Sequence, residues 1–262
     1  GNEIDHKTVD HCTRDFSNFV STQIFDQLPT NWQSAMIRTS IAREFDGNLL
    51  NLICGIENGW EIIDDFSQQG LAITPNHAES NYRYHPLLKE FLQNLFTRID
   101  SAKRITLHKC VTDWFLRNGN FRDAIKHALA CSDANFIAEV MEKAGGWHFI
   151  LDGRLTTFTK IINHVSTEII ERYPSTYLGK IMLIAKHGEV TKAYHLFDEF
   201  RAKTRNFITH NDQALTDSFK IEADVVSFFL DGLSDTPQTT QHMKKMESVL
   251  KEVGDNDHFL AA

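Results

Sequence analysis

The stretch that decides the fold is residues 81–96, which read NYRYHPLLKEFLQNLF. Its first part alternates polar residues with the aromatic residues Tyr82 and Tyr84, a pattern typical of a short β-strand. Pro86 then favours a helix start, because the first turn of a helix has no internal partner for the N–H that proline lacks. The apolar residues between 87 and 96 recur at helical spacing. The stretch therefore predicts a strand that leads directly into a helix.

The residues before this stretch supply a partner strand and several short helices. Residues 71–74, LAIT, predict the first strand of a hairpin, and residues 75–80, PNHAES, have the composition of a turn. Apolar spacing predicts helices that begin near Phe16 and Thr30, span 49–53, and run over 61–69. Several helices, one hairpin and a closing helix are the element order of a winged-helix domain.

The second half of the chain predicts helical hairpins. One is expected at residues 105–130, with a tight turn at Gly119, and another at residues 178–200, with a turn at Gly188. The two turn glycines are 69 residues apart, which is close to two repeats of about 34 residues. We therefore expect a degenerate tetratricopeptide-like array, with further helices at 158–165, 168–173, 213–230 and 239–253.

The predicted fold is mainly α, with one β-hairpin. We expect a flexible N-terminal segment at 1–15, a winged-helix domain at 16–102, a tetratricopeptide-like array of helical hairpins at 103–253 and a loose tail at 254–262. The chain begins with glycine rather than methionine, so we expect it to be processed or cut from a longer protein.

Composition limits the classes of protein to which the chain can belong. Its 262 residues are 42% hydrophobic and 24% charged, as in folded domains in water. No apolar run approaches the roughly 20 residues of a membrane span, and no signal-peptide pattern opens the chain. The four cysteines form no CxxC pair, which favours a reduced, intracellular protein. We expect a cytoplasmic protein with no membrane partner.

Charge argues against DNA binding by the predicted winged helix. Residues 1–105 hold nine basic and fourteen acidic side chains, a net charge of −5, and the whole chain carries −8. Modules that bind DNA usually present a basic stripe to the phosphates. We therefore expect this winged helix not to read DNA.

No motif of a common enzyme class occurs in the sequence. It lacks the phosphate-binding loop GxxxxGK[ST] and the patterns GxGxxG, GxSxG and HExxH. Asp64 and Asp65 resemble half of an aspartate-rich magnesium site, but no second acidic cluster matches them. We interpret the two aspartates as a solvated helix face and expect the chain not to be an enzyme.

Two groups of residues have the chemistry of metal ligands. His6, His11 and Cys12 lie in a polar segment, where we expect adventitious binding only. His127 and Cys131 are four residues apart, which is a ligand spacing on a helix, but two ligands do not complete a structural zinc site. We predict no bound metal.

His85 is the candidate functional residue. It lies between the predicted strand and a helix N-terminus, where free N–H groups and the helix dipole attract anions. An imidazole at this position can donate a hydrogen bond to a phosphate. It can also cap the helix or form a buried hydrogen bond, and the residue types alone leave these roles open.

The residues that surround His85 resemble those of a known family. RYHPL at 83–87 with FL at 91–92, followed by Asn118-Gly119 and AIKHAL at 124–129, is similar to the winged helix and first helical hairpin of MalT-like regulators. These are large ATP-binding members of the LuxR transcription-factor group, within the STAND class of signalling ATPases. The resemblance covers about residues 16–133 and extends weakly to about 204. Leu88 departs from the phenylalanine that is common in the family.

The resemblance implies a nucleotide switch. In the family, ADP lies between a nucleotide-binding domain and the winged helix, where a histidine that matches His85 contacts a phosphate; we expect Arg83 to assist it. A small-molecule or protein inducer on the helical array and exchange to ATP then permit self-association, which presents a C-terminal helix-turn-helix to DNA. Both flanking domains are missing here. The chain is therefore expected to be a regulatory middle fragment with no cofactor of its own, ATP or ADP belonging to the intact protein.

Two other interpretations remain open. The chain can be a stand-alone helical scaffold for protein–protein interaction without nucleotide, which requires a start codon just before Gly1. It can also be a helical enzyme that uses Asp64 and Asp65 with magnesium, which requires a second acidic cluster facing them.

Overall fold

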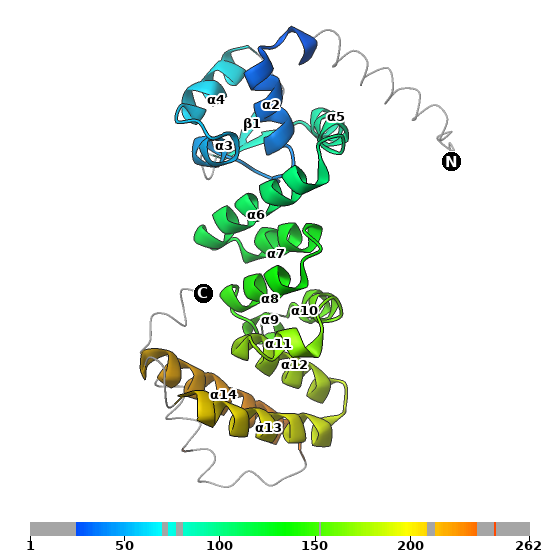
Figure 1. Ribbon diagram of the computed structural model, residues 1–262, viewed down its shortest axis with the longest axis vertical. Coiled ribbons are helices and arrows are strands. Elements are labelled where there is room, and N and C mark those ends of the chain that lie inside the picture. Colours follow the sequence, from blue (N-terminus) through cyan, green and yellow to red (C-terminus); the bar gives the residue numbers. More distant parts are fainter. Residues whose placement is uncertain are drawn as a thin grey trace, which may run out of the picture. The chain divides into compact units, whose positions relative to one another are not determined.

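A short β-hairpin lies among the helices of the first half of the chain, and the second half is helical (Figure 1). The computed structural model describes residues 25–69, 73–76, 81–151, 153–208, 213–234 and 244. Internal contacts divide the chain into unit 1, residues 1–131, and unit 2, residues 132–262. The predicted end segments 1–15 and 254–262, and most of the helices predicted from Phe16 and at 239–253, lie outside the described residues.

Unit 1 consists of short helices, a hairpin and two further helices after the closing helix of the hairpin. Its elements are η2 (Phe25–Gln27), α2 (Thr30–Thr39), α3 (Gly47–Cys54), α4 (Gly59–Gln68), β1 (Ile73–Asn76), β2 (Asn81–Tyr84), α5 (Pro86–Phe96), α6 (Ser101–Arg117) and α7 (Phe121–Ala130). The strands are antiparallel, with Ile73 opposite Tyr84 and Asn76 opposite Asn81. The predicted mainly α fold, with a hairpin before a closing helix, is confirmed.

Polar side chains and a proline set where several of these helices begin. Asp46 caps α3 by accepting a hydrogen bond from the backbone N–H of Leu49 at 2.7 Å. Asp100 caps α6 in the same way. Pro86 occupies the start of α5, as predicted. Each cap satisfies an N–H that the helix itself leaves without a partner.

Tyr84, the last residue of β2, anchors the hairpin to the helical core of unit 1. Its side chain is buried, and its hydroxyl lies 2.8 Å from the hydroxyl of Thr39 at the end of α2. Tyr84 is the donor, because Thr39 donates its own proton to the carbonyl of Ala35. The Tyr84 ring packs on Phe45, with 4.7 Å between centroids. Phe45 exchanges two backbone hydrogen bonds with Tyr82, which joins the segment before α3 to the hairpin.

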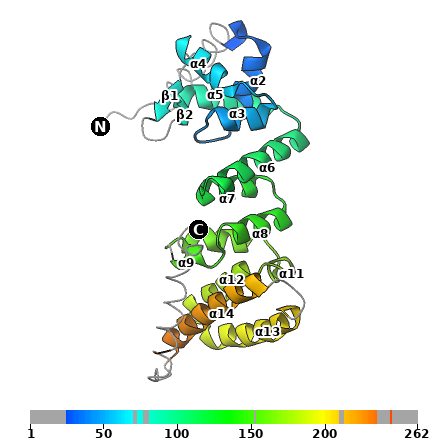
Figure 2. The same ribbon diagram turned by 90° about the vertical axis from the view of Figure 1, so that its left-hand side faces the viewer.

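Unit 2 is built around one central helix (Figure 2). Its elements are α8 (Ala134–Lys143), α9 (His148–Leu151), α10 (Leu155–Ile162), α11 (Thr167–Ile170), α12 (Pro174–Lys186), α13 (Val190–Ile208) and α14 (Gln213–Leu233). Helix α12 contacts all the other described helices of this unit. Among the helices that the structure describes, none combines the length and hydrophobicity that crossing a membrane requires.

Helical hairpins occur at the expected turns, but the residues between them are irregular. Gly119 separates α6 from α7, and Gly188 separates α12 from α13, with φ values of 67° and 89° that favour glycine. Between the two hairpins, α9 and α11 have only four residues each. Helix α8 is additional to the helices that the apolar spacing predicted. The described part of this interval therefore contains no strict repeat of about 34 residues.

Two carboxylates meet at the N-terminus of α12. Glu142 of α8 accepts hydrogen bonds from the backbone N–H groups of Ser175 at 2.9 Å and Thr176 at 2.7 Å, so a side chain from another helix caps α12. Glu222 of α14 accepts a hydrogen bond from the indole N–H of Trp147 at 3.0 Å. Burial raises the pKa of Glu222 to about 7, and the charge of Glu142 acts in the same direction.

Replacing Tyr84 with phenylalanine is expected to lower the free energy of unfolding by about 1 kcal/mol, because a buried hydrogen bond is lost while the ring remains packed. Tyr82→Phe is the matched control, since the half-buried Tyr82 hydroxyl has no hydrogen-bond partner among the described residues. The control should change stability by less than about 0.5 kcal/mol. Urea unfolding followed by circular dichroism measures both variants, and equal effects would contradict the anchoring role.

Replacing Glu222 with glutamine is expected to remove a pH-dependent loss of stability. The folded-state pKa of about 7 lies above the ordinary value of 4.5, so folding favours the protonated acid and stability falls as the pH rises between these values. At pH 8 the variant should exceed the parent in stability by about 1 to 3 kcal/mol, and near pH 4 the two should agree. Exposed Glu189→Gln is the control. If the unfolding free energies of Glu222→Gln and the parent differ by the same amount at every pH from 4 to 8, Glu222 is not the source of the pH dependence.

Candidate functional site

His85 is exposed at the N-terminus of α5, where its side chain also caps the helix. Its Nδ1 accepts a long hydrogen bond from the backbone N–H of Leu87 at 3.4 Å. Because Nδ1 is the acceptor, the neutral imidazole carries its proton on Nε2. Capping therefore leaves an N–H donor for a ligand, and the two roles considered for this histidine are compatible.

The neighbours of His85 restrict where its ring is presented. On one side, Tyr84 is buried and hydrogen-bonded to Thr39. On the other side, Pro86 begins α5, and the His85 backbone between them is extended, with φ −55° and ψ 139°. A residue held between a buried anchor and a helix start loses little further conformational freedom when it binds a ligand.

Arg83 is paired with an acid rather than presented as an unpaired cation. Its Nη2 donates to Oε1 of Glu44, whose side chain is only 17% exposed. The Nε of Arg83 is buried with no hydrogen-bond partner among the described residues. A phosphate bound by Arg83 would compete with Glu44 for the guanidinium. The predicted assistance of Arg83 to His85 therefore stays a prediction, and Glu44 is a partner that the local sequence did not reveal.

Lys89 adds positive charge one helical turn after His85. Its ammonium donates to the carbonyl of Ala42 at 2.7 Å and is half-buried. Burial lowers the pKa of Lys89, and only Asp123 opposes the effect. Three other cations lower it further: Lys126, Arg43 and Arg83. The charges that act on Lys89 are therefore mostly positive, although the sequence around it is acidic on average. The spacing of four residues from His85 was the available sequence signal for Lys89.

His127 and Cys131 take part in helix packing between α6 and α7. The Nδ1 atoms of His127 and His108 lie 2.9 Å apart, and the Cys131 thiol donates to the His127 carbonyl at 3.4 Å. The His127 ring stacks on Phe115, and burial lowers its pKa to about 3. Within the described residues, no group of three or more histidine, cysteine or acidic side chains could hold a metal ion. His6, His11 and Cys12 lie outside those residues.

Asp64 and Asp65 are both exposed on α4. Neither takes part in a hydrogen bond or an ion pair of its side chain with another described residue. This environment is that of a solvated helix face, as the sequence indicated.

The geometry of unit 1 defines a winged-helix domain that is followed by a helical hairpin, and comparison with known proteins identifies its type. Residues 21–104 match the family model described as the MalT winged helix domain. These residues are therefore similar to the MalT winged helix.

Relatives of two kinds match a longer part of the chain. The HTH-type transcriptional regulator MalT of Vibrio campbellii is 26% identical over 159 residues, and that of Serratia proteamaculans is 22% identical over 209 residues. These matches cover 60% and 79% of this chain. The serine/threonine-protein kinase PknK of Mycobacterium tuberculosis is 24% identical over 153 residues, 58% of this chain. The aligned segments span only 14% to 22% of the length of these relatives.

The His127 pKa predicts that unit 1 loses stability in acid. Its folded-state pKa of about 3 lies below the ordinary value of 6.5, so the unfolded chain takes up a proton first as the pH falls through this range. His127→Phe keeps a ring on Phe115 but cannot titrate. Between pH 7.5 and 5, the variant should lose about 1 to 2 kcal/mol less unfolding free energy than the parent.

Urea unfolding at a series of pH values measures this difference. The exposed His187→Gln variant is the control and should follow the parent at every pH. If His127→Phe also follows the parent, the buried histidine is not the source of acid sensitivity.

Proposed function

We propose that the chain is the part of a nucleotide-controlled transcription regulator in which the winged helix responds to the bound nucleotide. His85 contacts a phosphate through Nε2–H, and the nucleotide itself is held by a domain of the intact protein outside this chain. The observation that carries the proposal is the exposed His85 at the N-terminus of α5, with Nδ1 used as a cap and Lys89 one turn further along the same helix. A helix N-terminus and nearby cations both favour an anion.

The two kinds of relative support a regulatory role for this segment. One group is named as transcriptional regulators and the other as a protein kinase, and both are similar to this chain over more than 150 residues. DNA binding and protein phosphorylation are different activities, so neither explains the segment that both kinds of relative share. A control module common to both would explain it. The match of residues 21–104 to the MalT winged helix directs our choice to the transcription regulators.

The remaining roles follow from this proposal. ADP holds the intact cytoplasmic protein closed, and ATP permits self-association and DNA binding through a helix-turn-helix outside this chain. The helical hairpins of the tetratricopeptide-like region receive an inducer, either a small molecule or a protein. The chain itself performs no catalysis and holds no cofactor. The competing function is a helical scaffold that binds a protein partner without nucleotide.

Replacing His85 with alanine in the intact protein is expected to weaken ADP binding about tenfold, because one hydrogen bond to a charged phosphate is lost. Basal transcription should rise, since the closed state loses a contact. Isothermal titration with ADP and a promoter-reporter assay measure the two effects. Exposed His164→Ala is the matched control and should leave both unchanged. An unaltered ADP affinity in His85→Ala would favour the scaffold.

A further inference from the structure

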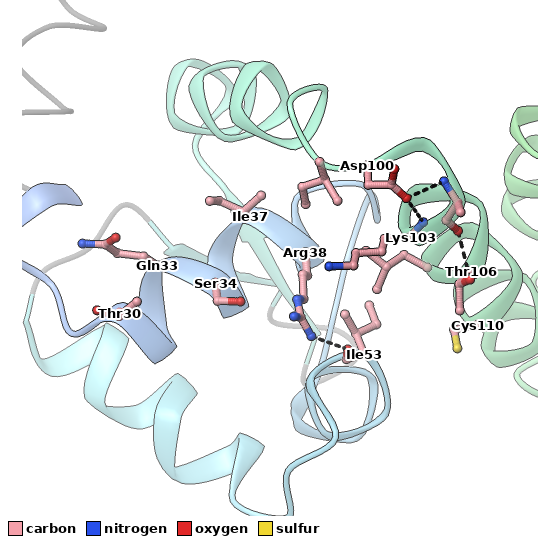
Figure 3. Close-up of a pocket in the computed structure, with 13 residues that line it drawn as sticks. Thr30, Gln33, Ser34, Ile37, Arg38, Ile53, Asp100, Lys103, Thr106 and Cys110 are labelled. Atoms are coloured by element: carbon pink, nitrogen blue, oxygen red, sulfur yellow. Dashed lines mark hydrogen bonds between the residues drawn. The ribbon is translucent and has the colours of Figure 1, made fainter.

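A concave site separate from His85 lies within unit 1, between α2, the end of α3 and the first turns of α6 (Figure 3). Its volume is about 770 Å³, in the range of roughly 300 to 1,000 Å³ that is common for small-molecule sites. None of its lining residues belongs to the group around His85. The pocket therefore requires an explanation of its own.

The pocket has apolar walls contributed by three helices and a loop. Ile37 comes from α2, Ile53 from α3 and Leu107 from α6, and Ile99 precedes α6. Ile53 is 5% exposed, while the other three side chains are half-buried. Such walls favour an occupant with an apolar body, because its burial removes hydrocarbon surface from water.

Two cations line the pocket, the half-buried Arg38 and the exposed Lys103. Figure 3 shows the side chain of Lys103 extending from α6 toward the guanidinium of Arg38 on α2. Arg38 donates one long hydrogen bond, at 3.4 Å, to the carbonyl of Ile53. The Lys103 ammonium has no hydrogen bond or ion pair with any described residue. An anion placed between these two cations would be attracted by both.

The acid among the pocket's lining residues caps α6 rather than pairing directly with these cations. Asp100 uses Oδ1 to accept the backbone N–H groups of Ala102 and Lys103, at 3.0 and 3.2 Å, and so caps α6. It forms no ion pair with Arg38 or Lys103. Counting Asp100 against the two cations leaves the charged lining with one net positive charge.

We propose that this pocket binds a small organic monoanion, a carboxylate or sulfonate with an apolar body. The anionic group lies between Arg38 and Lys103, and the apolar body lies against the isoleucine and leucine walls. Inorganic phosphate would leave most of the volume and the apolar walls unused. A neutral hydrocarbon would leave the two cations facing each other. The ligand contacts α2 and α6 together, so it links the winged helix to the hairpin that follows.

The test uses two fluorescent dyes that differ in one charged group. The probe is 8-anilinonaphthalene-1-sulfonate, and its neutral counterpart is N-phenyl-1-naphthylamine; both increase in fluorescence in apolar surroundings. Each is titrated into the full chain, and octanoate is then added as a competing carboxylate. We expect the sulfonate dye to bind at least about tenfold more tightly than the neutral dye, and octanoate to displace it.

Three variants locate the binding. The double variant Arg38→Gln, Lys103→Gln keeps the walls and should weaken the sulfonate dye roughly tenfold, with less than about twofold change for the neutral dye. Thr106→Trp, at an exposed lining position of α6, should fill the pocket and weaken both dyes. Arg117→Gln removes an exposed cation from the same helix outside the pocket and is the matched control.

Several results would overturn the proposal. These are equal affinity for the two dyes, no binding of either dye, or no displacement by octanoate. A loss of the sulfonate dye in Arg117→Gln as large as that in the double variant would assign the effect to general charge. Circular dichroism and thermal unfolding of each variant show whether a loss of binding reflects a loss of folding.

Discussion

The buried hydrogen bond from Tyr84 to Thr39 determines where the wing of unit 1 meets its helices. Tyr84 ends β2, and His85 follows it directly, so whatever holds Tyr84 also holds the candidate site. The packing of Tyr84 on Phe45 and the backbone pairing of Phe45 with Tyr82 add two further attachments to the same few residues. The exposed His85 ring is therefore carried by one of the more constrained parts of the domain.

Local patterns predicted the elements, and long-range partners set the chemistry. The dipeptide His85-Pro86 identified both the start of α5 and the residue that caps it, because both properties depend on adjacent residues. The fate of Arg83 could not be predicted in this way, since its partner Glu44 is 39 residues away. Between α7 and α12, the spacing predicted helices where α10 and α11 lie, but it missed α8 and α9. Helix α9 has only four residues, which leave little periodic pattern.

Average charge concealed two locally basic sites. The chain carries −8 overall, yet cations gather around Lys89 near α5 and around Arg38 and Lys103 in the pocket. Each group combines residues from separate elements, so no run of basic residues marks either one in the sequence. A DNA-binding surface needs a basic stripe along many phosphates, whereas a single phosphate or carboxylate needs only a few cations at short range.

A structure of the intact protein with bound ADP would show whether His85 contacts a nucleotide phosphate. We expect a phosphate oxygen within about 3.2 Å of His85 Nε2, with Nδ1 still facing the N–H of Leu87. ADP phosphates that lie on another surface, with the His85 ring still in solvent, would rule out a phosphate-sensing role for His85.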